Sequence, residues 1–222
     1  TWYKRQSTST LNGNVCTEET NDVEITVLNF LPGSISAAQT ICEGTAPAAL
    51  TAVAPSGDGT YTFQWQNSTD GSSFADIAGE TGATFAPPVL TVDTWYRRVV
   101  TATIGLTNCV EQTNAVKITV NNFVPGSISA DQTICESTPA AAFTSVSPTG
   151  DGVFTYQWQN STDGIVFANI GGATNETYNA GVLVADTWYK RLVTSTLSGN
   201  ACTEETNVVK VTVNNFDPGS IT

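Results

Sequence analysis

The chain has 222 residues, of which only 13% are charged, and its 20 acidic side chains outnumber the 8 basic ones to give a formal net charge of −12. Such an acidic surface repels phosphate backbones and anionic lipid, so neither nucleic acid nor membrane is expected as a partner. No apolar run approaches the roughly 20 residues of a membrane span, so no membrane insertion is expected in this segment. The chain has no histidine, which excludes Ser-His-Asp and Cys-His nucleophilic mechanisms.

The sequence repeats itself at a fixed interval. Trp2, Trp95 and Trp188 are 93 residues apart, and the phrases LNFLPGSIS, VNNFVPGSIS and VNNFDPGSIT return at the same spacing. A long period with every key residue in register is typical of an array of similar modules. We expect two complete modules, residues 32–124 and 125–217, between the last strands of another module in 1–31 and the start of the next in 218–222. The chain is then a window on a longer array.

The first 31 residues are predicted to form only the final two strands of a module. These strands are Trp2–Thr10 and Asp22–Leu28, with Cys16 in the hairpin between them. A hairpin alone is at best marginally stable in water. Its missing strands are expected from the same chain upstream. The alternative is a neighbouring chain that donates strands, so that the protein self-associates into a fibre.

Strand signals dominate each complete module. The stretches YTFQWQNS at 61–68 and FTYQWQNS at 154–161 alternate with period two, and so do KITVNNF and KVTVNNF. Turn words such as PSGDG, STDG and LSGN separate them, and no stretch has helical spacing. Short strands at regular intervals predict an all-β fold of tandem sandwiches, with Trp65 and Trp158 packed against the opposite sheet.

Several of these phrases carry a family resemblance. They are QTIC at Gln39–Cys42, QWQNSTDG at Gln64–Gly71, TWYRR at Thr94–Arg98, and Cys109 followed by Asn114–Val120. The combination, which the second module repeats, resembles the immunoglobulin-like repeats of very large surface proteins of Bacteroidota, which include gliding-motility adhesins exported by the type IX secretion system. The resemblance implies immunoglobulin-like β-sandwich modules in a linear array and an extracellular, cell-surface location. It implies a specific task only weakly.

The acidic residues that recur do not form a catalytic pattern. Each precedes a glycine or the start of a strand, as turn residues do; they are Asp58 and Asp151, Asp70 and Asp163, and Asp93 and Asp186. The chain also lacks a CxxC pair and a DxDxDG calcium loop, which leaves turn carboxylates as the only alternative for calcium. We therefore expect no enzyme, no catalytic residue, no metal site and no cofactor.

The tryptophans raise a second possibility. Trp95 and Trp188 each precede two basic residues, and one of each basic pair must share a face of its strand with the tryptophan. A structural use is expected, with the basic side chain along the ring. If the rings instead line an open groove, the modules form a polysaccharide-binding array for surface glycans. No ligand-binding residue is assigned.

Two cysteines per module in fixed register are expected to be oxidised. The pairing that needs the fewest assumptions is within a module, Cys42 with Cys109 and Cys135 with Cys202, at a separation of 67 residues. Such a bond contributes roughly 4 kcal/mol in the chain-entropy model. The alternative joins Cys42 to Cys202 of the following module, because immunoglobulin topology places the turn before the second strand and the last hairpin at opposite ends of a sandwich. Reduced thiols are the third possibility.

The connection between modules is short and carries an aromatic residue beside a proline. The residues expected to pack between modules are Phe30, Phe123 and Phe216 with Pro32, Pro125 and Pro218. Burial of such a phenylalanine contributes roughly 1.5–3 kcal/mol, and Phe123 is expected to lie outside either core. These features predict a semi-rigid stalk in a large surface adhesin or filament, which spans distance and presents an adhesive surface. Its partners are neighbouring modules of the same chain.

Overall fold

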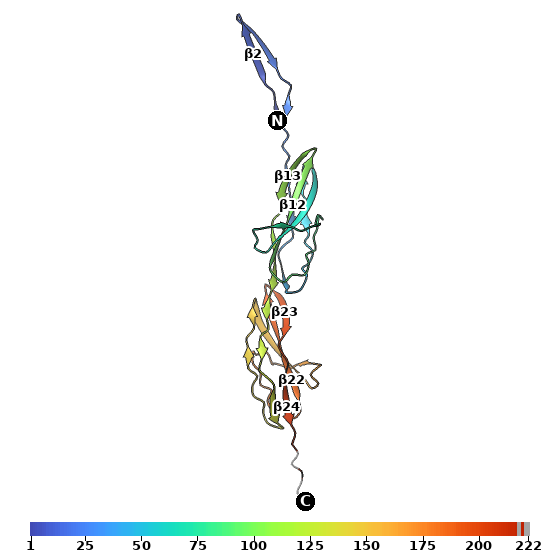
Figure 1. The fold of residues 1–222 in the computed structure, drawn as a ribbon, viewed down its shortest axis with the longest axis vertical. Helices are drawn as coiled ribbons and strands as arrows, with labels where there is room; N and C mark the ends of the chain where they lie inside the picture. Colours follow the sequence, from blue (N-terminus) through green and yellow to red (C-terminus); the bar gives the residue numbers. More distant parts are fainter. Residues whose placement is uncertain (217–218, 220–222) are drawn as a thin grey trace.

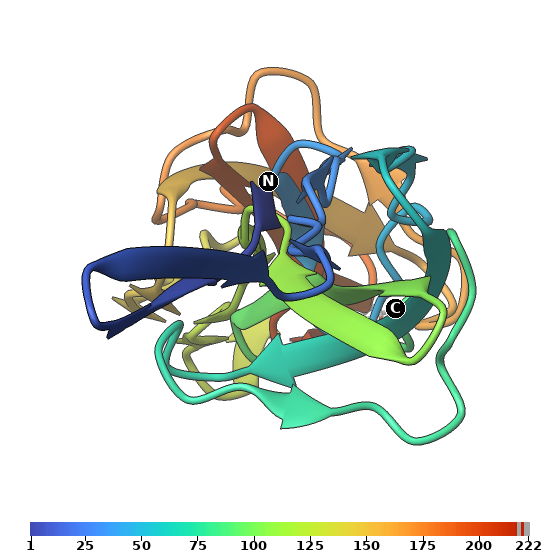
Figure 2. The same ribbon diagram turned by 90° about the horizontal axis from the view of Figure 1, so that it is seen from above.

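A computed structural model describes residues 1–216 and residue 219. Figure 1 shows an elongated molecule in which an N-terminal hairpin and two sandwiches follow one another along one axis. Viewed along that axis, the two sandwiches overlap (Figure 2), so they are stacked end to end rather than side by side. Every element of the described chain is a β-strand. Within this part of the chain there is consequently no helix that could cross a membrane.

The N-terminal segment forms two short antiparallel ladders. Strand β1 (Trp2–Tyr3) pairs with β4 (Val23–Glu24), and β2 (Gln6–Leu11) pairs with β3 (Asn14–Glu19). Asn12 and Gly13 connect β2 to β3 with φ values of 51° and 80°, which is the two-residue turn that matches the twist of a hairpin. All four strands are exposed.

The first complete module has one large sheet and one thin layer facing it. The large sheet has the order β11-β10-β12-β14-β7, with β13 paired to β12, and β7 runs parallel to β14. The thin layer consists of the pairs β5–β9 and β6–β8, extended by bridges from Leu50 to Phe85 and from Thr45 to Leu90. The bounds are β5 (Phe30–Leu31), β6 (Ser34–Ile35), β7 (Gln39–Cys42), β8 (Ala52–Val53), β9 (Ser56–Gly57), β10 (Thr60–Ser68), β11 (Ala75–Asp76), β12 (Thr94–Ile104), β13 (Thr107–Gln112) and β14 (Val116–Asn121).

The second module repeats this arrangement. Its large sheet has the order β17-β24-β22-β20-β21, with β23 paired to β22, and its thin layer holds the pairs β15–β19 and β16–β18. The bounds are β15 (Phe123–Val124), β16 (Ser127–Ile128), β17 (Gln132–Cys135), β18 (Ser145–Val146), β19 (Thr149–Gly150), β20 (Val153–Ser161), β21 (Ala168–Asn169), β22 (Thr187–Leu197), β23 (Asn200–Glu205) and β24 (Val209–Asn214). The prediction of tandem immunoglobulin-like sandwiches is confirmed.

A tryptophan occupies the centre of each core. Trp65 and Trp158 are fully buried, and their rings lie 5.5 Å from Phe85 and Phe143 respectively. Each indole N–H donates to a backbone carbonyl at 2.9 Å, so the large apolar surface is buried without an unpaired donor. The predicted core role of these two residues is confirmed.

An arginine is buried between the two layers of each module. Arg98 on β12 donates from Nη1 to the carbonyl of Ala83 at 2.8 Å and from Nη2 to that of Val53 on β8 at 3.3 Å. Its guanidinium also lies 4.3 Å from the ring centroid of Phe63. Burial lowers the pKa of Arg98. The carbonyls and the ring stabilise the charge at the Nη atoms, whereas the buried Nε has no hydrogen-bond partner among the described residues. Arg191 holds the same position in the second module.

Candidate functional site: the junction between the modules

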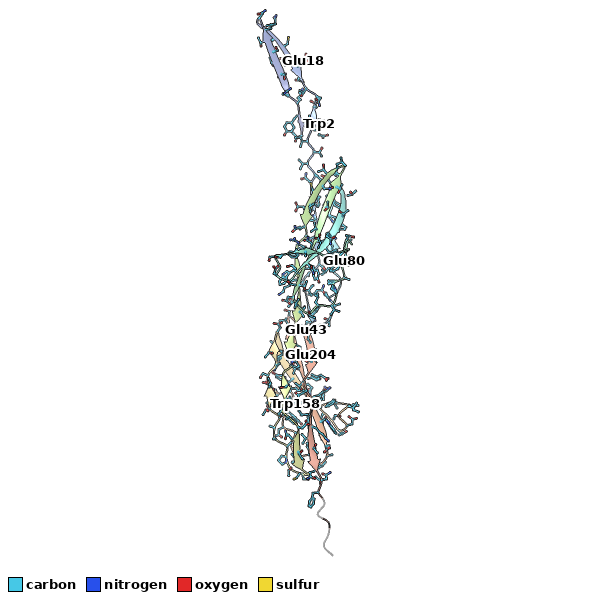
Figure 3. All side chains as sticks on the ribbon, viewed as in Figure 1. Trp2, Glu18, Glu43, Glu80, Trp158 and Glu204 are labelled. Atoms are coloured by element: carbon cyan, nitrogen blue, oxygen red, sulfur yellow. A yellow bond between two sulfur atoms is a disulfide. The ribbon has the colours of Figure 1, made fainter. Side chains whose placement is uncertain are left out.

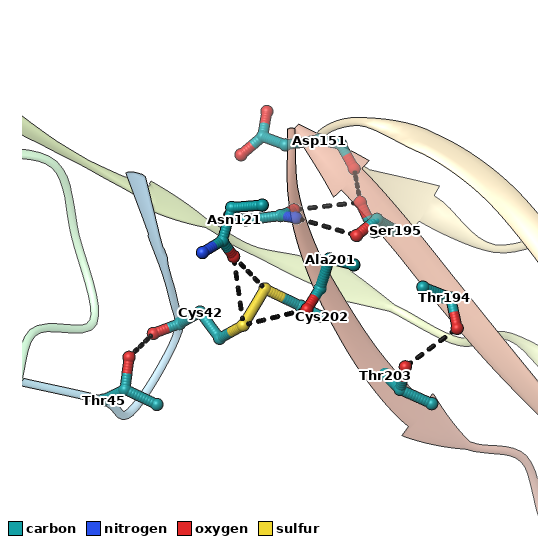
Figure 4. Close-up of a disulfide and its surroundings, with 10 residues drawn as sticks. Cys42, Thr45, Asn121, Asp151, Thr194, Ser195, Ala201, Cys202 and Thr203 are labelled. Atoms are coloured by element: carbon teal, nitrogen blue, oxygen red, sulfur yellow. Dashed lines mark hydrogen bonds between the residues drawn. A yellow bond between two sulfur atoms is a disulfide. The ribbon is translucent and has the colours of Figure 1, made fainter. Parts of the chain in front are cut away.

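A disulfide joins Cys42 of the first module to Cys202 of the second, with the two Cα atoms 5.5 Å apart. Cys42 ends β7 and lies opposite Asn121, the last residue of β14, so it sits at the end of the sheet that faces the second module. Cys202 lies on β23 opposite Ser195 on β22, close to the turn of that hairpin. Figure 4 shows the hairpin reaching back to β7.

The within-module pairing expected from the sequence is wrong for Cys42. Cys109 lies opposite Ala102 near the β12–β13 turn, at the other end of the module from Cys42. A disulfide requires its two Cα atoms to lie within about 7 Å, so a bond within the module cannot form without rearranging the fold. Cys135 is likewise not bonded to Cys202, and it is free together with Cys16 and Cys109. The structure has the alternative, a clamp between neighbouring modules.

A buried polar pair lies beside the disulfide. The side-chain amide of Asn121 donates to the carbonyl of Ser195 at 3.1 Å, and the Ser195 hydroxyl faces two acceptors, Asn121 Oδ1 at 3.0 Å and the carbonyl of Asp151 at 2.5 Å. Asn121 and Ser195 are almost completely excluded from solvent. Since each buried polar group has a partner, this contact between the modules carries no unpaired polar group and fixes their register.

The sequence carries a signal for this pair. The positions one repeat upstream of Asn121 and Ser195 are Leu28 and Ala102. Asn121 lies at the end of the last strand of the first module, and Ser195 lies in the module that follows it. At the equivalent positions one repeat upstream both residues are apolar, so the two positions change from apolar to polar together. Neither position stands out alone.

Phe123 belongs to the second module, which corrects the expectation that it lies outside both cores. It opens β15 and pairs with Gly150, is only 9% exposed, and lies 5.7 Å from the ring of Phe154. A Cβ on Gly150 would lie 2.6 Å from the Cα of Phe123, so the close approach requires glycine there. Cys42 packs against this same cluster. Only Asn122 separates β14 from β15, and no flexible linker exists between the modules.

The other residues expected at the boundary have different surroundings. Phe30 pairs with Gly57 inside the first module, and Phe216 is largely exposed. The carbonyls of Pro32 and Pro125 accept from the buried arginines of their own modules, at 3.5 Å and 3.2 Å, and thus help to close each sandwich. Pro218 lies outside the described residues.

Two carboxylates flank the disulfide. Glu43 follows Cys42, Glu204 lies near Cys202, and both line a cavity of about 30 Å³ together with the two cysteines. Figure 3 shows the two acidic side chains at the junction. Disulfide reduction requires attack by a thiolate. A negatively charged, narrow approach disfavours that attack, which is consistent with a structural bond.

The rings of Trp95 and Trp188, on the outer faces of the sheets, are packed against neighbouring residues. Trp95 is half-buried, Lys117 Nζ lies 4.9 Å from the centroid of its ring, and a Cβ on Gly71 would lie 3.1 Å from the ring. Arg97 lies over Phe74 at 4.1 Å rather than along Trp95, contrary to the expected stacking. Trp188 of the second module has the same surroundings, with Lys210 at 4.8 Å and Gly164 against the ring. The structural role of these rings is therefore favoured over sugar stacking.

The recurring aspartates are turn and strand-end residues. Asp70 Oδ1 accepts from the backbone N–H groups of Ser72 and Ser73 at 2.7 Å, and these bonds lower the pKa of its carboxyl. Asp93 accepts from the N–H of Val120 and pairs with Lys117 at 2.6 Å. Across residues 1–216 and 219, no cluster of three or more His, Cys, Asp or Glu side chains is arranged to hold a metal ion.

A family model described as "Domain of unknown function (DUF8696)" matches residues 31–122 and 124–215. The chain belongs to this family and contains two tandem copies of its domain. No curated protein matches the chain.

Several solved structures are similar to the chain at low identity. The N-terminal four Ig domains of Dscam1 isoform 6.9 share 16% identity, with 92% of this chain and 52% of that chain covered and a TM-score of 0.39. Domains A168–A170 of titin share 15%, over 95% and 75%, with a TM-score of 0.39. A marsupial T cell receptor shares 12%, over 89% and 75%, with a TM-score of 0.40. The chain spans about half the length of the Dscam1 fragment, and these similarities carry no information on function.

Proposed function

We propose that the chain is a semi-rigid spacer segment of a large extracellular surface protein, in which sandwich modules are locked end to end and no module is an enzyme. The observation that carries the proposal is the Cys42–Cys202 bond across the junction. The modules are thereby connected at two places, by the peptide between β14 and β15 and by the disulfide. A single connection permits swivelling and bending, whereas two connections beside a buried contact resist both.

The chemistry of the junction supports an extracellular location. Disulfides persist in oxidising compartments and are rare in reducing ones. An acidic surface of net charge −12 favours solubility and keeps the long chains apart. Repeated modules and the phrases shared with Bacteroidota surface repeats support the finer proposal, a stalk in a giant adhesin that carries an adhesive surface away from the cell.

Residual dipolar couplings test the rigidity of the junction. In the oxidised protein, both modules should share one alignment tensor, because their relative orientation is fixed. The Cys42→Ser variant should give two tensors of different magnitude. A Cys109→Ser/Cys135→Ser double variant, which removes only free thiols, is the matched control and should behave as wild type. Independent reorientation of the modules in the oxidised protein would contradict the proposal.

A further inference from the structure

The disulfide connects two segments that each cross a module once. Residues 30–42 contain β5, β6 and β7. Phe30 lies beside Gly57 and 6.0 Å from Tyr61, near the β12–β13 turn at the upstream end of the first module. Cys42 lies at the downstream end, opposite the last residue of β14. The segment therefore runs the length of the module in one direction.

The second segment does the same in the second module. Residues 202–214 contain most of β23 and all of β24, and both strands pair with β22 in the same direction. Cys202 lies near the hairpin turn at the upstream end, and Asn214 pairs with Cys135 at the downstream end. Joined through the two sulfur atoms, the segments form one covalent line along the long axis seen in Figure 1.

The rest of both modules lies inside the loop that the disulfide closes. Cys42 and Cys202 are 160 residues apart in sequence. The enclosed residues include both core tryptophans and the long central strands β10, β12, β20 and β22. Fully extended, this length of chain measures about 570 Å, at about 3.6 Å per residue.

We propose that this line is a tensile strap, so that the clamp gives the two modules a second function as a strain-limited tether. Tension along the long axis passes from residues 30–42 through the disulfide to residues 202–214, and the enclosed chain lies outside the covalent load path. When either core unfolds, the residues between Cys42 and Cys202 then add nothing to the end-to-end length of the tether. The inference rests on the proposed function, because only a spacer that is pulled at its two ends carries load along its long axis.

The strap is fastened to the modules along its length. Asn207, in the gap between β23 and β24, accepts from the N–H of Ile128 at 2.8 Å and donates to its carbonyl at 3.1 Å, which ties the strap to the thin layer. In the same gap, Thr206 bonds Arg191 through its N–H and its hydroxyl, both at 3.0 Å. In the first module, β7 is held by its ladder with β14. These hydrogen bonds hold the strap against both modules, while the covalent load path still runs through the strap alone.

Single-molecule stretching between the two ends of the full chain tests the proposal. The oxidised protein should show no lengthening step longer than about 100 Å, the contour of the N-terminal hairpin. After reduction, or in the Cys42→Ser variant, two steps of about 300 Å each should appear, one for each module. The Cys109→Ser/Cys135→Ser variant keeps the clamp and should match the oxidised wild type.

Two outcomes would overturn the strap. One is a step of about 300 Å in oxidised protein whose Cys42–Cys202 bond is verified by mass spectrometry, and the other is the absence of that bond. The dipolar-coupling experiment is independent. A shared tensor together with long steps rejects the strap and keeps the spacer, whereas freely moving modules without long steps reject the rigid spacer and keep the strap.

Discussion

The N-terminal hairpin and the last strands of the two modules share sequence words but have opposite surroundings. Tyr3, Tyr96 and Tyr189 occupy the same repeat position and are 57%, 1% and 2% exposed. The hairpin register is nevertheless the same in all three copies, since Ser9, Ala102 and Ser195 each face the cysteine of the returning strand. Strand pairing is therefore encoded within the two strands, whereas burial depends on strands from earlier in the repeat.

The largest expected effect separates these two kinds of tyrosine. Tyr96→Ala removes a ring that lies 5.5 Å from Phe85 in the first core, and should lower the free energy of unfolding of that module by about 3–5 kcal/mol. Tyr3→Ala should change stability by less than about 0.5 kcal/mol, because the side chain is exposed. Denaturant unfolding followed by fluorescence measures both variants. Equal losses would show that the hairpin is also packed in solution.

The next effect compares phenylalanines at the module boundary. Phe123→Ala should destabilise the second module by about 3 kcal/mol, because Phe123 is part of its buried cluster. Phe216 occupies the same repeat position but is 78% exposed, so Phe216→Ala is the matched control and should have almost no effect. Thermal unfolding of the two variants measures the melting temperature of each module, and shows whether Phe123 belongs to the core of the second module. If Phe123→Ala loosens the junction yet leaves both melting temperatures unchanged, Phe123 is a plug and not part of a core.

A smaller effect concerns the buried polar pair. Ser195→Ala leaves Asn121 Oδ1 without its donor and should cost about 1–3 kcal/mol. Asn121→Leu combined with Ser195→Ala reproduces the apolar pair at Leu28 and Ala102, and should be closer to wild type than the sum of the single changes. A double-mutant cycle measures this coupling, expected to exceed about 0.5 kcal/mol. Additive losses would mean that the two residues do not act together.

The smallest expected effect is the acid response of an exposed turn. Hydrogen bonds from the N–H groups of Val166 and Ile165 lower the pKa of Asp163 to about 2 from a usual 3.8. A carboxyl with a depressed pKa in the folded state contributes stability above its unfolded pKa, and loses it as pH falls through the folded value. Melting temperatures between pH 5 and pH 2 should therefore fall less steeply in Asp163→Asn than in wild type. Parallel curves would contradict this.

The sequence was sufficient to predict the modules, but it left the cysteine pairing at their junction open. Alternation and the fixed repeat were sufficient for the sandwich and for Trp65 and Trp158, because both patterns extend over many residues. The cysteine pairing depends on β7 lying parallel to β14. A strand of four residues, such as β7, does not reveal from its sequence whether it pairs parallel or antiparallel to its neighbour. Phe123 was misplaced because β15 has two residues, too few for alternation. Both errors arise where short segments form contacts between distant parts of the chain.

The burial of one arginine per module could have been predicted from the alternation of side chains along a strand. Adjacent side chains on a strand face opposite ways, so if Arg97 lies on the outer face, Arg98 must point inward. The expectation of stacking on the tryptophan concerned only the outward member of each basic pair, and a buried cation without a carboxylate partner is uncommon. Backbone carbonyls and an aromatic ring take the place of the carboxylate around Arg98.

Non-reducing peptide mapping of the purified oxidised chain tests the clamp most directly. The mapping should recover a peptide containing Cys42 linked to one containing Cys202, with Cys109 and Cys135 recovered as thiols. Recovery of Cys42 linked to Cys109 and of Cys135 linked to Cys202 would contradict the account, because the bonds would then close each module separately and leave the junction unlocked.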